Sequence, residues 1–284
     1  METPDRLTGQ VAIVTGGGSG IGRAVVELLV ESGVAGVIIA DIEPLADDDV
    51  ERLRELADGD VLSVQIDVSD ARQVKEMVAQ THERFGRIDI LINNAATVSA
   101  SRQLTPDGYE MTFAVNHLSP FLLTGLLLPL LGEGARVINV ASEAHRWGAL
   151  DLDDLHNKKR YGAMRVYGQS KSANILWNQE LARRLTGSGV TANSLHPGAI
   201  STNLGRGNGF AFDLLQRFVG LFMKSPERGA ESSIYLATAQ DVKGVSGRYF
   251  DNCHEREPAS HATDPVTAQR LWQLSEELVG FHYL

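Results

Sequence analysis

The sequence predicts an α/β protein, built as one domain around a parallel sheet with helices on both faces. Two observations carry this prediction. Short apolar runs alternate with segments of helical spacing along nearly the whole chain, and a glycine cluster follows the first run. Such alternation implies right-handed crossovers and therefore a doubly wound parallel sheet. Because no linker or internal repeat marks a second unit, we expect one nucleotide-binding domain over all 284 residues.

Seven apolar runs have the length and composition of buried strands. The first ends in glycines, the second ends in an acid, and the sixth stops at Pro197-Gly198. The predicted strands are residues 10–15, 36–41, 61–67, 88–93, 135–142, 190–196 and 245–250.

The segments between these strands have helical spacing, and several carry a helix-start signal. Ser69 is the expected N-cap of the third helix. Pro226 takes the favoured first position of a helix, and Asp264-Pro265 opens the last one. The predicted helices are residues 20–32, 50–57, 70–85, 107–131, 165–185, a helix starting at 226, and 264–279.

The alternation breaks over residues 199–224, after the sixth predicted strand. This segment is rich in glycine, asparagine and phenylalanine, which is typical of a substrate lid but also of a plain surface loop. Its apolar side chains suit either a hydrophobic substrate or a subunit interface. They are Phe210, Phe212, Leu214, Leu215, Phe218 and Phe222.

Composition argues against several classes of protein. The formal net charge of −10, without a basic stripe, argues against a nucleic-acid partner. The single cysteine, Cys253, cannot form an intrachain disulfide, and the first residues lack the pattern of a signal peptide.

The most apolar run, residues 121–131, is shorter than the roughly 20 residues of a membrane helix, so we expect a buried helix. We therefore expect a cytoplasmic protein without a membrane partner. We also expect no metal, because His, Asp and Glu lack ligand spacing.

The glycine cluster at residues 15–22 predicts a dinucleotide site, although a glycine-rich turn without a ligand has the same composition. It follows a strand and opens a helix, so glycines let the backbone approach a pyrophosphate while the helix N-terminus supplies N–H groups. The expected contacts are Gly16, Ser19, Gly20, Ile21 and Gly22.

Asp41 indicates which dinucleotide binds. It ends the second strand about 20 residues after the glycines, where a carboxylate accepts hydrogen bonds from an adenosine ribose diol and repels a 2′-phosphate. We therefore expect NAD, with NADP as the alternative. Asp67 and Val68 end the third strand and are expected beside the adenine, unless Asp67 only closes a turn.

Tyr167 and Lys171 are four residues apart in a predicted helix, which places both side chains on one face. A free tyrosine has a pKa of about 10, and an opposite charge within about 4–6 Å favours the phenolate. We expect this phenol to exchange a proton near neutral pH. Taken alone, the spacing also fits an ordinary surface pair.

Further motifs follow in a fixed order. They are Asp67-Val68, Asn93-Asn94-Ala95, Asn116, Ser142, Tyr167 with Lys171, and Pro197-Gly198 followed by Thr202. With the glycine motif, they resemble the short-chain dehydrogenase/reductase family, whose fold is the Rossmann fold, over nearly the whole chain. Residues 116–121, 170–197 and 247–250 are similar to its retinol-dehydrogenase-like branch.

The resemblance implies an oxidoreductase that moves a hydride between nicotinamide and a hydrophobic alcohol or carbonyl. It makes Tyr167 the general acid or base, Lys171 the group that keeps this phenol ionisable and bonds the nicotinamide ribose, and Ser142 a donor to the substrate oxygen. The main-chain carbonyl of Asn116 is expected to hold a water linked to Lys171. Because Pro120 has no N–H for that carbonyl, we expect the helix to kink there.

Other residues are expected around the cofactor and the substrate. His145 and Trp147 follow Ser142 and are expected to border the substrate; His145 is either a second proton carrier or polar surface. Thr202 is either a cofactor contact or an N-cap. The expected cofactor wall comprises Asn93, Asn94, Ala95, Ala96, Val115, Pro197, Gly198 and Thr202.

One departure from the family pattern concerns Ala96, where the family has glycine. The extra methyl makes positive φ costly, so we expect a small local adjustment. The resemblance also implies a homodimer or homotetramer formed by the helices around Asn116 and Tyr167. Two further readings stay open: an NADP-dependent carbonyl reductase, and a non-catalytic nucleotide-binding scaffold. The scaffold is disfavoured because Tyr167, Lys171 and Ser142 are all present.

Overall fold

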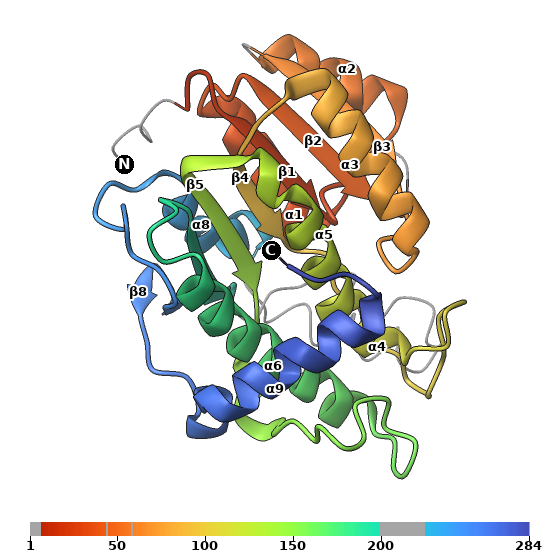
Figure 1. The fold of residues 1–284 in the computed structure, drawn as a ribbon. Coiled ribbons are helices and arrows are strands. Elements are labelled where there is room, and N and C mark those ends of the chain that lie inside the picture. Colours follow the sequence, from red (N-terminus) through yellow and green to blue (C-terminus); the bar gives the residue numbers. More distant parts are fainter. Residues whose placement is uncertain (1–6, 44, 58, 199–224, 284) are drawn as a thin grey trace.

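The structure, a computed structural model, describes residues 7–43, 45–57, 59–198 and 225–283. Within these ranges one sheet runs through the molecule in the order β3-β2-β1-β4-β5-β6-β7-β8 (Figure 1). The first seven strands are parallel, and β8 pairs antiparallel with β7. The strands are β1 (Val11–Thr15), β2 (Gly36–Asp41), β3 (Asp60–Gln65), β4 (Ile88–Asn93), β5 (Leu131–Val140), β6 (Thr191–His196), β7 (Tyr249–Asp251) and β8 (His254–Glu255). The predicted doubly wound fold is confirmed, with eight strands where seven were expected.

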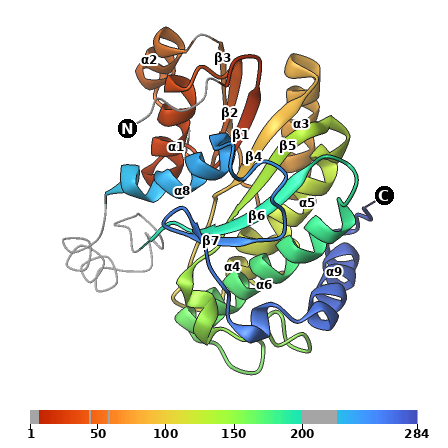
Figure 2. The same cartoon turned by 90° about the vertical axis from the view of Figure 1, so that its left-hand side faces the viewer.

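Helices cover both faces of the sheet (Figure 2). The described helices are α1 (Gly20–Glu31), α2 (Asp47–Leu56), α3 (Ala71–Phe85), α4 (Met111–Phe113), α5 (Ser119–Leu127), α6 (Ala163–Arg184), α8 (Pro226–Thr238) and α9 (Pro265–Val279). Side chains of α1, α2 and α8 join one apolar cluster with alternate residues of β1, and those of α3, α5, α6 and α9 join a second. Each face therefore has its own core.

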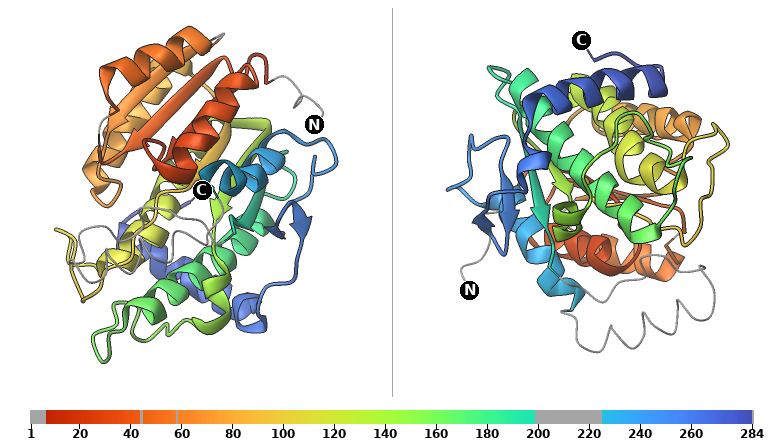
Figure 3. Two further views of the ribbon diagram at one scale, coloured as in Figure 1. Left: turned by 180° about the vertical axis from the view of Figure 1, so that it is seen from behind. Right: turned by 90° about the horizontal axis from the view of Figure 1, so that it is seen from below.

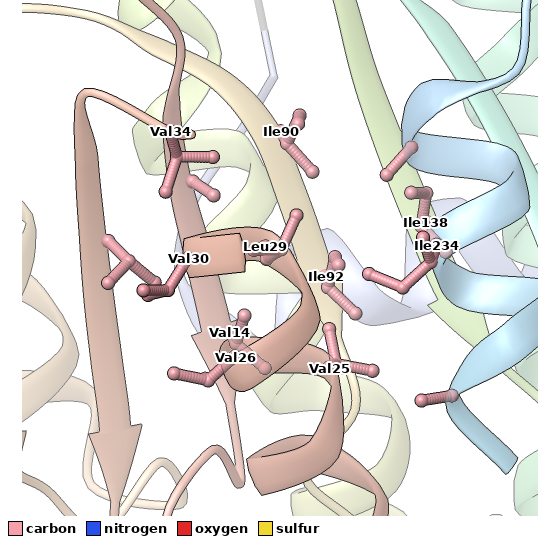
Figure 4. Close-up of a cluster of buried hydrophobic side chains, with 14 of the residues drawn as sticks. Val14, Val25, Val26, Leu29, Val30, Val34, Ile90, Ile92, Ile138 and Ile234 are labelled. Carbon is pink, nitrogen blue, oxygen red and sulfur yellow. The ribbon is translucent and has the colours of Figure 1, made fainter. Parts of the chain in front are cut away.

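The central strand β1 explains why both cores form. All five of its residues are buried, with Ala12 and Val14 in one cluster and Val11 and Ile13 in the other. Figure 4 shows Val14 beside Val26 of α1 in the first cluster. Because successive side chains of a strand point to opposite faces, a continuous apolar run is what a strand covered on both sides requires.

Several element boundaries differ from the predictions, such as the start of α2 at Asp47 and not at residue 50, and three have a clear local reason. The N-cap of α3 is Asp70 and not Ser69: its carboxylate accepts the N–H groups of Arg72 (2.9 Å) and Gln73 (3.3 Å). Strand β5 starts at Leu131, which pairs with Ile88 ahead of a register shift. Strand β7 starts at Tyr249 and not at residue 245, because a turn and the positive φ of Gly247 (78°) precede it.

The long apolar helix predicted at residues 107–131 is present but interrupted. It consists of α4, a π-helical turn (Ala114–Leu118), α5 and a 3₁₀ turn (Leu128–Leu130). By length and composition, the 20 residues Met111–Leu130, with a hydropathy of 1.5, are long and apolar enough to cross a membrane, so the apolar stretch is longer than the sequence run indicated. Within the fold, 78% of an 18-residue stretch of this segment is buried, as in a core helix. The expected absence of a membrane partner stays a prediction.

Helix α9 and the tail after it cover α5 and α6 (Figure 3). Trp272 of α9 is completely buried, and the ring of Tyr283 lies 4.5 Å from it and 4.9 Å from Phe121 of α5. The guanidinium of Arg184, at the end of α6, lies 4.2 Å from the Trp272 ring centre. A dimer formed through these helices would have to use the surface that α9 leaves free, and the oligomeric state stays a prediction.

Candidate active site

Tyr167, Lys171 and Ser142 lie together at the carboxyl end of β5. The Lys171 ammonium donates to the carbonyl of Val140, the last residue of β5, at 2.9 Å. Its nitrogen lies 5.6 Å from the centre of the Tyr167 ring, and the Ser142 side chain is close enough to the phenol to lower its pKa. The structure thus brings together, from α6 and from the turn after β5, the three groups that the sequence singled out.

Two glycines allow this close approach. A Cβ on Gly148 would lie 2.0 Å from the main-chain carbon of Gly168, and one on Gly168 would lie 2.8 Å from the carbonyl oxygen of Ala144. The 3₁₀ turn after β5 (Glu143–Trp147) therefore rests directly on α6, one residue past Tyr167. Sequence reasoning missed both glycines, although the position of Gly168 next to Tyr167 was a usable signal.

Burial shifts the pKa values of both Tyr167 and Lys171. It raises the pKa of Tyr167, against a lowering by the Ser142 hydrogen bond, and it lowers the pKa of Lys171 from 10.5 to about 7. The ammonium was expected to lower the pKa of the phenol, but the pKa of Tyr167 is raised. Desolvation penalises the charged forms of both residues. Near pH 7, Tyr167 is a neutral proton donor beside a lysine that is about half protonated.

The glycine loop is held tightly against the end of β4. A Cβ on Gly22 would lie 1.8 Å from the carbonyl oxygen of Gly16, a contact that only glycine permits. The Asn94 amide donates to the carbonyls of Thr15 (2.9 Å) and Gly16 (3.1 Å), and the Thr15 hydroxyl accepts the N–H groups of Asn94 and Ala95, both at 3.0 Å. Thr15 was not predicted as a site residue, and it orders this loop.

The N-terminus of α1 is suited to an anion. Ser19 makes no side-chain capping bond there, and the first turn contains no acidic residue. Main-chain N–H groups of a first helical turn have no partner within the helix and favour negative charge. Ser19, Gly20 and Ile21 thus occupy the positions expected for pyrophosphate contacts, and those contacts stay a prediction.

Asp41 lies against the glycine loop from the end of β2. Its carboxylate accepts the N–H of Gly18 at 2.8 Å and that of Glu43 at 3.2 Å, and a Cβ on Gly18 would lie 2.9 Å from it. Asp67 accepts the N–H and the hydroxyl of Ser69, both at 2.8 Å, so it does close a turn. An adenine contact from Asp67 or the half-buried Val68 stays a prediction.

The expected cofactor wall divides into three groups. Asn93 is buried and donates to Thr124 (3.1 Å) and to Asn139 (2.8 Å), and Asn139 donates to Asn178 (2.9 Å), so the Asn93 side chain is turned into the core and does not line a cofactor. Half-buried positions are available for contact. They are Ala95, Ala96, Val115, Pro197 and Gly198. Thr202 and the predicted lid at 199–224 lie outside the described residues.

Two local distortions were expected. Ala96 does not have positive φ, so its methyl causes no strain of that kind. Just before Pro120 the helix contains the π-helical turn, in which the N–H of Ser119 bonds the carbonyl of Ala114, and the kink stays a prediction. Such turns shift the hydrogen-bond pattern of the helix by one residue and are frequent at functional sites.

The Asn116 side chain bonds both main-chain groups of Thr97 (2.7 and 3.0 Å) and the hydroxyl of Ser170 (2.9 Å). The water at its carbonyl stays a prediction.

His145 and Trp147 have opposite environments. His145 is completely buried with both ring nitrogens bonded to main-chain atoms. Trp147 is 63% exposed and precedes Gly148, which packs beside Tyr167. Burial rules out polar surface for His145, and the substrate contacts of His145 and Trp147 stay predictions.

Comparison with known proteins gives the same picture. Residues 10–209 match the family model described as short chain dehydrogenase. The chain is 41% identical to retinol dehydrogenase 13 of Homo sapiens, over 96% of this chain and 86% of that protein. It is 38% identical to retinol dehydrogenase 14 of Mus musculus, over 98% of this chain and 88% of that protein. A solved structure of an uncharacterised protein from Mycobacterium paratuberculosis matches with a TM-score of 0.80 and 31% identity, over 99% and 97% of the two chains.

The chain belongs to the short-chain dehydrogenase/reductase family. This makes it an oxidoreductase that acts on an alcohol or carbonyl with a nicotinamide cofactor. Within that family it belongs to the retinol-dehydrogenase-like branch.

The Gly16–Gly22 contact predicts that Gly22→Ala weakens cofactor binding. The added methyl must displace the Gly16 carbonyl and with it the loop. We expect the dissociation constant for NADH, measured by fluorescence titration, to rise by about tenfold or more, or about 1.4 kcal/mol. Gly132→Ala is the matched control, because a Cβ there meets no atom within 4 Å. Equal affinities of the Gly22→Ala and Gly132→Ala proteins would contradict the prediction.

The lowered pKa of Lys171 predicts a dependence of stability on pH. Between its folded pKa of about 7 and the ordinary 10.5, the unfolded chain binds more protons at this residue than the folded chain. Its contribution to the free energy of unfolding therefore rises with pH across this window. We expect the wild type to gain stability over Lys171→Met between about pH 7 and about pH 9 in urea unfolding. Parallel pH profiles would count against this.

Proposed function

We propose that this protein is an NAD-dependent oxidoreductase that transfers a hydride between nicotinamide and a hydrophobic alcohol or carbonyl, with Tyr167 as general acid or base. One observation carries the proposal: Tyr167, Lys171 and Ser142 meet at the end of β5, where the ammonium lies 5.6 Å from the phenol ring and the Ser142 side chain lowers the pKa of the phenol. The cytoplasmic location and the homo-oligomeric state expected from the sequence belong to the same proposal.

The described residues fit a dinucleotide. The contact of Gly22 with Gly16 leaves the loop free of side chains, and the α1 N-terminus offers unpaired N–H groups to a pyrophosphate. The half-buried Ala95, Val115 and Gly198 offer a surface for the nicotinamide end. When bound, the nicotinamide supplies the hydride or accepts it.

The proton steps are assigned to this chain's own side chains. The Ser142 oxygen already accepts the N–H of Ala144 at 3.2 Å, which leaves its hydroxyl hydrogen free to bond an oxygen nearby. During reduction, Tyr167 gives its proton to the substrate oxygen while Ser142 stabilises the developing negative charge. Lys171 then limits the cost of the resulting phenolate, since its ammonium lies 5.6 Å from the ring centre. Oxidation runs the same steps in reverse.

The preference for NAD rests on charge at the end of β2. The Asp41 carboxylate faces the glycine loop, where a 2′-phosphate would have to lie close to it. The charge of Arg23 is offset by Glu27 (3.0 Å) and Asp49 (3.4 Å), although its Nη1 has no hydrogen-bond partner. These contacts favour NAD over the alternative, an NADP-dependent carbonyl reductase.

A hydrophobic substrate is supported by the exposed indole of Trp147 and by the names of the relatives, which are retinol dehydrogenases. An exposed indole next to a polar reaction centre is suited to an apolar substrate chain. The aromatic residues at 210–222 fit the same reading and lie outside the described residues.

Tyr167→Phe tests the chemical role. Because the phenol is the proposed proton carrier, we expect kcat to fall by at least about 100-fold, while the dissociation constant for NADH stays unchanged. Turnover is measured with a panel of alcohols and carbonyls by NADH absorbance. Tyr161→Phe is the matched control, since that hydroxyl donates to the Ser99 carbonyl. Retained turnover in Tyr167→Phe would reject the assignment, and an inactive wild type would favour the non-catalytic scaffold.

Titration with NADH and NADPH tests the role of Asp41. We expect the wild type to bind NADH more tightly. Asp41→Asn keeps an acceptor for the Gly18 N–H but removes the charge, so we expect the preference for NADH to fall by about tenfold. Asp47→Asn, at an exposed position of α2, is the control. Tighter binding of NADPH by the wild type would contradict the proposal.

A further inference from the structure

His145 is fixed in one tautomer by its two ring contacts. Its Nε2 accepts the N–H of Ala259 at 3.1 Å, and its Nδ1 lies 2.7 Å from the carbonyl oxygen of Ser142. An amide N–H only donates, so Nε2 carries no hydrogen. The imidazole is therefore neutral with its hydrogen on Nδ1, from which it donates to Ser142.

The main chain of His145 is anchored as firmly as its ring. Its carbonyl oxygen accepts the hydroxyl of Ser172 at 3.1 Å, one residue beyond Lys171, and lies 2.8 Å from Nε2 of His261. The ring meets that of Tyr249 edge-on, with centres 5.1 Å apart. His145 thus joins the turn after β5 to α6, to β7 and to the segment around residues 259–261.

These contacts converge on Ser142. Ser142 is extended, with φ −166° and ψ 153°, and its carbonyl is held by His145 while its side-chain oxygen is held by Ala144 at 3.2 Å. With both ends fixed, the hydroxyl has little freedom beyond rotation of its hydrogen. A donor held in this way stabilises developing charge without reorganising during the reaction.

We propose that His145 is a positioning residue, which through its Nδ1 hydrogen fixes the main chain of Ser142 and so aims the Ser142 hydroxyl at the substrate oxygen. This inference rests on the proposed function, since it gives the Ser142 hydroxyl a part in the reaction. Both bonds satisfy the buried ring, and the one from Nδ1 in addition ends on the main chain of Ser142 itself.

Two variants each keep only one of the two hydrogen bonds made by the His145 imidazole. In His145→Asn, the side-chain amide lies near the position of Nδ1 and keeps a donor for Ser142, but it does not reach Ala259. In His145→Gln, the longer side chain reaches Ala259 with its oxygen but leaves the Ser142 carbonyl with only the main-chain N–H of residue 145 as its donor, at 3.1 Å. We expect kcat to fall by about 10- to 100-fold in His145→Gln and by no more than about threefold in His145→Asn.

The dissociation constant for NADH and the thermal stability of both variants separate a positioning role from a merely structural one. We expect the dissociation constant for NADH to stay unchanged in both variants, and both to lose thermal stability by similar amounts. If the wild type is active and both variants lose kcat in proportion to their loss of stability, the role of His145 is overturned. The proposed function is not affected by that result. A wild type that turns over no alcohol or carbonyl would instead overturn the proposed function, and with it the purpose assigned to His145.

A measurement on the wild type alone completes the test and needs no variant to fold. Nitrogen NMR spectra of the labelled histidine rings report which nitrogen carries the hydrogen, and His145→Gln identifies the signal by its loss. We expect a hydrogen on Nδ1 at neutral pH. A hydrogen on Nε2 would overturn the inference, because Nδ1 would then have nothing to donate to Ser142.

Discussion

Burial of the sheet on both faces is the constraint on which the other features depend. Because β1 packs against α1 on one side and joins the cluster of α3, α5 and α6 on the other, both faces around this strand are apolar and closed to solvent. Parallel strands all end at the same edge, and there the chain places Asp41, Asn94, Ser142 and the two groups from α6. The cofactor loop and the proton-carrying residues are neighbours because the crossovers leave them no other place.

Desolvation then sets the chemistry at this edge. Lys171 lies under the end of β5 with one hydrogen bond, to Val140, and burial moves its pKa down while it moves that of Tyr167 up. The site therefore holds a neutral phenol and a lysine that titrates near neutral pH. Ser142, fixed at its carbonyl and at its oxygen, supplies the directional bond that neither of the other two groups provides.

The sequence predicted the fold well because apolar runs and glycine spacing are local signals, and both are strong here. It placed Tyr167, Lys171 and Ser142 correctly for the same reason. It chose Ser69 over Asp70 as a cap because adjacent residues of similar capping strength cannot be ranked from composition. Strand β8 has only two residues and leaves no pattern. The burial of His145 depends on Ala259, over one hundred residues away, and the direction of the Tyr167 pKa depends on solvent exclusion.

The covering of α5 and α6 by the C-terminal helix has a consequence for how the chain matures. Trp272 and Tyr283 complete the aromatic cluster around Phe121, yet they leave the ribosome after every strand of the described sheet. Until these two residues emerge, the nascent protein carries an uncovered apolar surface beside its newly formed sheet. That interval is when a folding helper protein would be needed most and when mispairing with a neighbouring nascent chain is easiest.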